Sequence, residues 1–134
     1  SMRGKGMSLP VVTSGLTHGL GLMGDLFVEP GDVLLLPDKI WEYRLIYEVR
    51  RGAKIEQYPF FKGPGFNIEG FRAALGEVCR RNSKVVVLLN FPNNPTGYAP
   101  TDAEGKAIAE ALVEAAERGT NVVAILDDAY FGLF

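Results

Sequence analysis

The sequence predicts an α/β fold, a three-layer sandwich in which a mainly parallel sheet lies between helices. Short apolar runs alternate along the 134 residues with segments whose apolar residues recur at helical spacing. This alternation is typical of parallel sheets whose connecting helices cover both faces. The run at 84–90 contains five consecutive aliphatic residues, which indicates a strand buried on both faces.

The first half of the chain predicts three strands and two helices, each bounded by turn residues. Pro30-Gly31 stop the first helix and Gly52 ends the second. The third strand runs into the breaker-rich segment 62–65. The predicted elements are, in order, a strand at 9–13, a helix at 16–28, a strand at 32–36, a helix at 41–51 and a strand at 54–60.

The second half repeats the alternation, with clearer helix boundaries. Asn67 can cap a helix with its side chain. Thr101 followed by Glu104 makes a capping box for a helix to about Arg118, and Gly119 fits the position just past its end. The predicted elements are a helix after Asn67 with Phe71, Ala74, Leu75 and Val78 on its apolar face, a strand at 84–90, the helix to Arg118 with Ile108, Leu112 and Ala115 inward, and a strand at 122–126.

The composition predicts a soluble cytoplasmic protein. Apolar residues make up 47% and charged residues 22% of the chain, and the net charge of −2 gives no reason to expect a nucleic acid or an acidic membrane surface as partner. Cys79 is the only cysteine, so an internal disulfide is excluded and a reducing compartment is favoured. The longest apolar stretch, Val85–Leu89, is too short to span a bilayer.

Polar side chains follow the last two predicted strands, at the sheet edge where open α/β folds bind ligands. Asn94, in the segment Asn94-Pro95-Thr96-Gly97, can donate to a phenolic oxygen of a ligand or bond only its own backbone. Asp127 can pair with a protonated ring nitrogen, and Tyr130 can reach the same ligand. Alternatively Asp127 and Asp128 bind Mg²⁺, or one of them caps the next helix.

Two earlier strand-to-helix junctions point to the same edge. At Ser14-Gly15-Leu16-Thr17, backbone N–H groups and the Thr17 hydroxyl lie at a positive helix end, which suits a phosphate. The alternative is an ordinary glycine turn with Thr17 as the helix cap. Trp41 can stack on a flat heteroaromatic ring, or it can be a core residue.

Together these segments resemble the class I/II aminotransferases, fold-type-I enzymes that use pyridoxal 5′-phosphate (PLP). The resemblance covers about Val11 to Phe134, and the motif order and spacing make it specific. It implies that residues 10–134 are a partial PLP-binding large domain, truncated at both ends. Ser1-Met2 is typical of an expression remnant, so we expect residues 1–9 to be remnant and linker. The motifs are Gly15-Leu16-Thr17, Pro30-Gly31-Asp32, Trp41 eleven residues before Gly52, Asn94-Pro95-Thr96-Gly97 and Asp127-Asp128-Ala129-Tyr130.

The resemblance also implies a role for each candidate residue. Asp127 would pair with the pyridinium nitrogen and keep it protonated, which makes the ring an electron sink. The spacing to Tyr130 selects Asp127 rather than Asp128 for this role. The other implied contacts are Gly15, Leu16 and Thr17 with the phosphate, Trp41 with the face of the ring, and Asn94 and Tyr130 with the phenolic oxygen.

The residue expected to perform covalent chemistry is absent. In the family, the Schiff-base lysine lies after a later strand, and covalent catalysis needs its amine. None of the six lysines has a matching context: Lys5, Lys39, Lys54, Lys62, Lys84 and Lys106. We therefore expect no catalytic residue, no metal ligand and no transamination by this chain alone.

The family sheet would place two later strands between 9–13 and 122–126. Their absence predicts a four-stranded core with one orphaned strand and open edges, which is stable only by self-association, by swapping or as the ordered remnant of a longer polypeptide. The resemblance itself implies a homodimer. The predicted function is the PLP-binding core of an aminotransferase that moves an amino group between an amino acid and a 2-oxo acid. The alternatives are a lyase or synthase of the same family, a non-catalytic PLP-binding or association module, and a Mg²⁺-dependent phosphotransfer domain, which would leave Trp41 and Asn94 unexplained.

Overall fold

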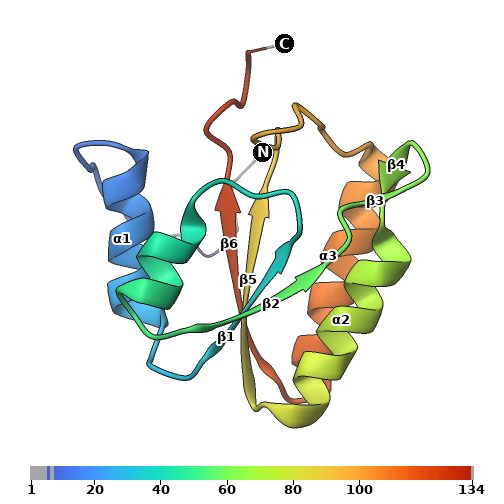
Figure 1. Ribbon diagram of the computed structural model, residues 1–134, viewed down its shortest axis with the longest axis horizontal. Helices are drawn as coiled ribbons and strands as arrows, with labels where there is room; N and C mark the ends of the chain where they lie inside the picture. The colour runs from blue at the N-terminus through green and yellow to red at the C-terminus, as the bar shows by residue number, and fades with distance from the viewer. Residues whose placement is uncertain (1–5, 7, 134) are drawn as a thin grey trace.

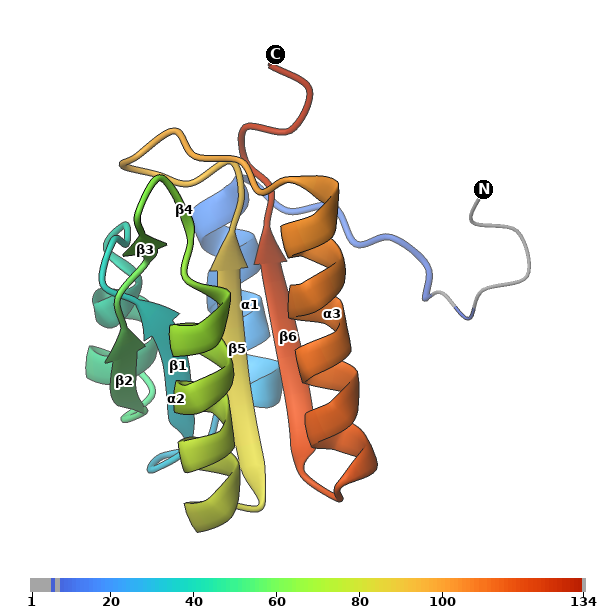
Figure 2. The same ribbon diagram turned by 90° about the vertical axis from the view of Figure 1, so that its right-hand side faces the viewer.

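A parallel four-stranded sheet separates two helical layers in the computed structural model, which describes residue 6 and residues 8–133 (Figures 1 and 2). Helices α1 and η1, the latter a π-helix, cover one face, and α2 and α3 cover the other. The predicted three-layer sandwich is thus confirmed. The sheet has the order β2-β1-β5-β6, and the elements are α1 Leu16–Phe27, β1 Val33–Pro37, η1 Leu45–Val49, β2 Lys54–Tyr58, α2 Ile68–Arg81, β5 Lys84–Asn90, α3 Asp102–Glu117 and β6 Asn121–Asp127.

The two central strands are buried on both faces. Successive side chains of a strand point to opposite faces of the sheet. In β5, Val85 and Val87 therefore pack under α2 and α3, whereas Val86 and Leu88 pack under α1 and η1. All five residues of β1 are buried as well. The strands pair in parallel, and β5 and β6 are in register from Lys84 beside Asn121 to the ends of both strands.

The helix boundaries follow the capping residues. The Asn67 side chain accepts a hydrogen bond from the N–H of Gly70 at 2.9 Å, which satisfies a free donor in the first turn of α2. Thr101 and Glu104 form the predicted capping box of α3. Gly119 follows α3 with a φ of 96°, a conformation that favours glycine. These three predictions are confirmed.

The predicted strand at 9–13 is wrong, because the described residues offer it no partner. The segment is irregular, and its side chains are exposed, including Val11 at 79% and Val12 at 96%. A strand needs a neighbour to satisfy its backbone N–H and C=O groups, and the four strands of the sheet pair with one another. The described sheet therefore has four strands rather than five. This number agrees with the four-stranded core expected when the segment 9–13 lacks its neighbouring strands.

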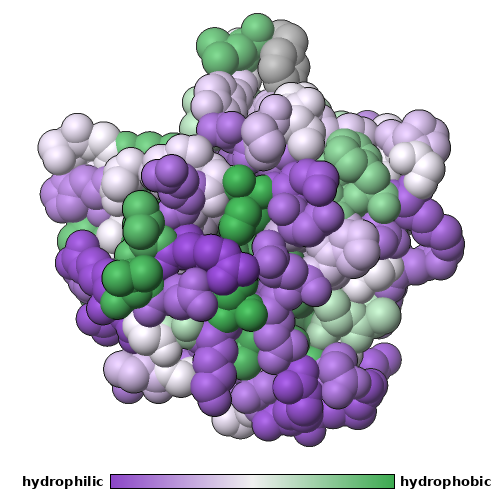
Figure 3. Space-filling model, in the orientation of Figure 1, coloured by the Kyte–Doolittle hydropathy of each residue, from purple (hydrophilic) through white to green (hydrophobic). Residues whose placement is uncertain are grey.

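Three smaller differences lie between β1 and α2. The helix predicted at 41–51 is found as the shorter π-helix η1, Leu45–Val49. The third predicted strand stops at Tyr58, because the Phe60 N–H bonds to the Asp38 carboxylate at 2.8 Å instead of continuing the ladder. The breaker-rich segment 62–65 joins a short antiparallel pair, β3 Phe61–Lys62 and β4 Gly65–Phe66. Residues 1–5 and 7, within the predicted remnant and linker, lie outside the described residues. No helix in the described part of the chain is long and apolar enough to cross a membrane. Hydrophilic residues cover most of the face shown in Figure 3, with smaller hydrophobic patches between them.

Candidate functional site

A pocket of about 200 Å³ lies where the carboxyl ends of β5 and β6 meet the start of α1. Six of the seven residues predicted to contact a cofactor line it; the seventh, Gly15, directly precedes α1 as its N-cap and is not in the lining. The sheet edge thus brings together side chains that are distant in sequence. The lining residues are Leu16, Thr17, Leu20, Trp41, Tyr43, Asn90, Asn94, Asp127, Ala129 and Tyr130.

Asp127 brings a buried carboxylate to this pocket. It is the last residue of β6 and is only 4% exposed. Its Oδ2 accepts a hydrogen bond from the Tyr43 hydroxyl at 2.5 Å, and its Oδ1 accepts one from the N–H of Ala129 at 3.2 Å. Buried charges are retained where hydrogen bonds compensate them. The carboxylate is therefore held in one orientation at the wall of the pocket.

Tyr43 is a site residue that the sequence analysis did not assign. It is 1% exposed, and burial, followed by the hydrogen bond to Asp127, raises the pKa of its phenol above the ordinary value. The hydroxyl therefore keeps its proton and acts as the donor. Tyr47, one helical turn later, is also buried, and its hydroxyl donates to the carbonyl of Leu20 at 3.1 Å. Their spacing of four residues, which places both on one helix face, was the available signal.

The loop after β5 leaves the Asn94 side chain free of the local turn bonds. The local turn bonds are made by Asn93, whose Oδ1 accepts from the Thr96 hydroxyl at 2.6 Å and from the Thr96 N–H at 3.2 Å. The Asn94 side chain instead points toward Tyr130, with 3.4 Å between Nδ2 and the phenolic oxygen. Asn90, at the end of β5, supports both sides of the pocket. Its side chain accepts from the Asn94 N–H at 2.7 Å and donates to the Asp127 carbonyl at 3.1 Å.

Trp41 and Thr17 face the pocket from the helical layer. The Trp41 ring is partly buried and meets the Tyr43 ring edge-on, with 5.5 Å between centroids. No side-chain hydrogen bond caps the start of α1, so its first N–H groups have no side-chain acceptor among the described residues. Such a helix end favours an anion.

The two aspartates at the end of β6, Asp127 within it and Asp128 just after it, do not share the pocket. Asp127 lines it, whereas Asp128 is exposed, and its carbonyl accepts the N–H of Phe131 in a turn. Within the part of the chain that the structure describes, no group of three or more His, Cys, Asp or Glu side chains could hold a metal ion. The geometry thus gives no support to the two-aspartate magnesium site.

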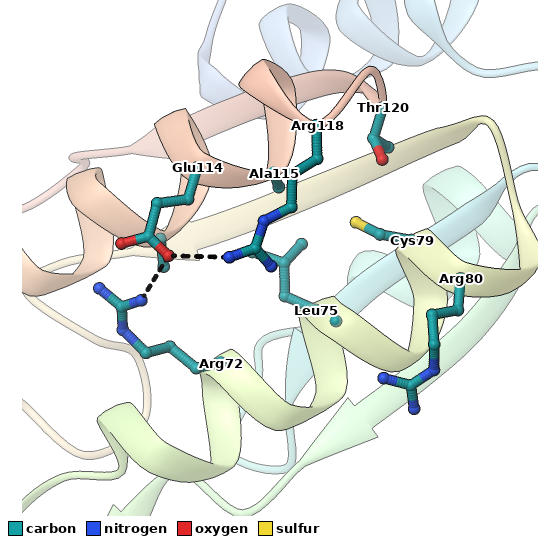
Figure 4. Close-up of a pocket in the computed structure, with 10 residues that line it drawn as sticks. Arg72, Leu75, Cys79, Arg80, Glu114, Ala115, Arg118 and Thr120 are labelled. Carbon is teal, nitrogen blue, oxygen red and sulfur yellow. Dashed lines mark hydrogen bonds and ion pairs between the residues drawn. The ribbon is translucent and has the colours of Figure 1, made fainter.

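A larger hollow of about 510 Å³ lies on the opposite face, between α2 and α3 (Figure 4). Its floor is made of small or apolar side chains such as Leu75 and Ala115. Glu114 binds the Arg72 guanidinium at 2.9 Å and lies 3.8 Å from that of Arg118. Because these charges are paired, the hollow presents a packing groove between two helices rather than a set of free ligand-binding groups.

The structure is a parallel α/β domain with a pocket at the carboxyl ends of its strands. The family model for aminotransferase class I and II matches residues 7–134. The chain therefore belongs to this family.

Related proteins share only part of their length with this chain. It is 31% identical over 104 residues to the aspartate aminotransferase of Musicola paradisiaca, covering 78% of this chain and 25% of that protein. It is 36% identical over 90 residues to an LL-diaminopimelate aminotransferase of Dehalococcoides mccartyi, covering 66% and 22%. An aminotransferase structure from Anaerococcus prevotii superposes with a TM-score of 0.77 at 30% identity, covering 82% of this chain and 28% of that one. The chain thus spans about a quarter of the length of these proteins.

Proposed function

We propose that this chain is the PLP-binding core of an aminotransferase that moves an amino group between an amino acid and a 2-oxo acid. The observation that carries the proposal is the buried Asp127 carboxylate at the wall of a pocket that Trp41 and Asn94 also line. Membership of the aminotransferase family supports it. We also propose that residues 10–134 form part of the cofactor-binding domain, and the lone Cys79 supports a cytoplasmic location.

The side chains that line the pocket are chemically suited to bind PLP. A buried carboxylate can pair with a protonated ring nitrogen, and the indole of Trp41 offers an aromatic surface to the ring. Asn94 and Tyr130 supply an amide and a phenol for the ring's phenolic oxygen. The start of α1, with the Thr17 hydroxyl beside it, suits the phosphate. When bound, PLP supplies an electron-accepting ring for chemistry at the amino-bearing carbon of a substrate.

The substrate and the exact reaction are proposed only as classes. The related proteins named above are an aspartate and an LL-diaminopimelate aminotransferase, so family membership does not select one amino acid. A PLP-dependent lyase or synthase remains the alternative reaction. A non-catalytic PLP-binding or association module is the alternative for the 134-residue chain alone, since no described lysine lines the pocket.

We expect the chain to bind PLP reversibly and without a covalent lysine adduct. The test is a PLP titration followed by quenching of Trp41 fluorescence, because Trp41 is the only tryptophan. Borohydride reduction and intact mass then report any lysine adduct. Asp127→Asn removes the charge that would pair with the ring nitrogen. It should raise the Kd by roughly ten- to a hundredfold, since a hydrogen bond to a charged group contributes about 1.5–3 kcal/mol.

Two outcomes would contradict this prediction. Stoichiometric reduction at one lysine would show that the chain supplies its own Schiff-base amine. Equal affinity of the wild type and Asp127→Asn for PLP would show that the Asp127 carboxylate does not contribute to PLP binding. Circular dichroism of both proteins controls for loss of fold.

We further propose that the chain self-associates as a homodimer through the open edge of its sheet. Among the described strands, β6 pairs with a neighbour on one side only, and open edges favour pairing with another chain. Leu126 on this strand is 71% exposed, and Phe131 just beyond it is 82% exposed.

Sedimentation equilibrium should show a concentration-dependent dimer. Leu126→Lys should shift it toward monomer, whereas Val113→Lys on the outer face of α3 should not. A wild-type monomer at every concentration would refute the proposal.

A further inference from the structure

Tyr43 connects two of the residues that line the candidate cofactor pocket. Its hydroxyl donates to Asp127 Oδ2 at 2.5 Å, across 84 positions of sequence, and its ring meets the Trp41 ring edge-on at 5.5 Å between centroids. Tyr43 is 1% and Asp127 is 4% exposed, so water does not compete for this hydrogen bond. One buried side chain thus contacts both the predicted partner of the ring nitrogen and the predicted partner of the ring face.

We infer that Tyr43 is a positioning residue, whose hydroxyl orients the Asp127 carboxylate toward the ring nitrogen of the cofactor. The inference rests on the proposed function, because it needs a ligand whose ring carries a protonated nitrogen. Tyr43 acts through Asp127.

The hydrogen bonds of Asp127 explain how this positioning operates. A carboxylate has two oxygens, each of which can accept about two hydrogen bonds. Tyr43 occupies one site on Oδ2, and the Ala129 N–H occupies one on Oδ1. These two donors fix the plane of the carboxylate, because they hold both oxygens from different elements. The remaining acceptor sites are available to a donor in the pocket.

The surroundings of Tyr43 keep its hydroxyl in the donor role. Burial comes first among the causes that raise the pKa of this phenol, followed by the charge and hydrogen bond of Asp127 and smaller effects of Tyr47 and Tyr130. The proton therefore stays on Tyr43, and Asp127 remains the acceptor. The 2.5 Å hydrogen bond from this hydroxyl to Asp127 Oδ2 gives it a specific partner rather than a space-filling role alone.

The test compares two ligands, PLP and its deaza analogue, in which carbon replaces the ring nitrogen. Calorimetric titration of Tyr43→Phe should show PLP binding weakened about tenfold, while the affinity for the analogue changes less than about twofold. The substitution keeps the ring and its contact with Trp41 and removes only the hydroxyl. In the Asp127→Asn background, Tyr43→Phe should have no further effect on PLP binding, because the residue through which it acts is already changed.

Tyr47→Phe is the matched control. It also removes a buried phenolic hydrogen bond from the same helix, but this bond goes to the Leu20 carbonyl and not to Asp127. It should leave the ratio of the two affinities unchanged. Circular dichroism identifies any variant that fails to fold. Tyr43→Leu, which also removes the hydroxyl, then serves as a second variant, and it too should weaken PLP binding more than binding of the analogue.

The outcomes separate the inference from the function on which it rests. Equal weakening of PLP and of the analogue, or no weakening of either, would overturn the positioning role while the proposed cofactor stands. No binding of PLP by the wild-type chain would overturn the proposed function and the inference together.

Discussion

Phe71→Ala is expected to destabilise the fold strongly, so that the variant unfolds at a much lower urea concentration than the wild type at neutral pH. The Phe71 side chain is fully buried in α2 and packs against the rings of Tyr58 and Phe66, with centroids at 5.4 and 6.2 Å. Truncating a buried phenylalanine costs about 3–5 kcal/mol, because transfer energy is lost and a cavity remains. Domains are stable by only about 5–15 kcal/mol. The loss therefore removes a large part of the total.

Urea unfolding followed by circular dichroism measures this change through the shift of the midpoint. Val113→Ala on the outer face of α3 is the control, since Val113 is 55% exposed. Its free energy of unfolding should change by less than about 0.5 kcal/mol. If Phe71→Ala lowered the free energy of unfolding by less than about 1 kcal/mol, the packing of Phe71 in the core would not be a major source of stability.

The sequence predicted those parts of the fold whose signals are local. Five consecutive aliphatic residues predicted β5 with its observed bounds, Lys84–Asn90. The start of α2 follows from Asn67, and the start of α3 follows from Thr101. In each case the deciding interaction joins residues within about one helical turn, so the sequence alone contains it.

The parts that the sequence did not predict depend on distant partners. The apolar run at 9–13 has the composition of a strand but no strand beside it, so its side chains remain exposed. The strand propensity of these residues cannot reveal a missing neighbour, because strand formation also depends on pairing and packing. The end of β2 at Tyr58 depends on a hydrogen bond between Phe60 and Asp38, 22 positions away.

The candidate site shows the same division. Motif spacing predicted the side chains that line the pocket, such as Trp41 and Asp127. It did not predict the buried hydrogen bond from Tyr43 to Asp127, because that contact joins the segment just before η1 to the end of β6, 84 positions away in sequence. Whether these residues bind PLP stays a prediction for the titrations proposed above.

We expect the chain to lose stability steeply above about pH 10, the ordinary pKa of tyrosine. Burial is the first cause that raises the pKa of three phenols, those of Tyr43, Tyr47 and Tyr58. In the unfolded chain these phenols ionise near pH 10, whereas in the folded chain they keep their protons to higher pH. The folded state then binds more protons, so its stability is complete below about pH 10 and falls as the pH rises.

The size of this effect follows from the number of buried phenols. Each contributes a slope of about 1.4 kcal/mol per pH unit once the unfolded chain is ionised, so three give roughly 4 kcal/mol per unit. Urea unfolding at a series of alkaline pH values measures the slope. Tyrosinate absorbance should rise together with the loss of circular dichroism, since unfolding exposes these phenols.

Tyr58→Phe provides the sharpest test, because Tyr58 differs from the other two tyrosines. Tyr43 and Tyr47 donate hydrogen bonds, whereas the buried Tyr58 hydroxyl has no hydrogen-bond partner among the described residues. Replacing it by hydrogen keeps the packing and removes an unsatisfied polar group, which costs about 1–3 kcal/mol when buried. The variant should therefore be more stable at neutral pH and lose about a third of the alkaline slope. An unchanged slope would mean that Tyr58 does not titrate on unfolding, and lower stability at neutral pH would mean that its hydroxyl has a partner.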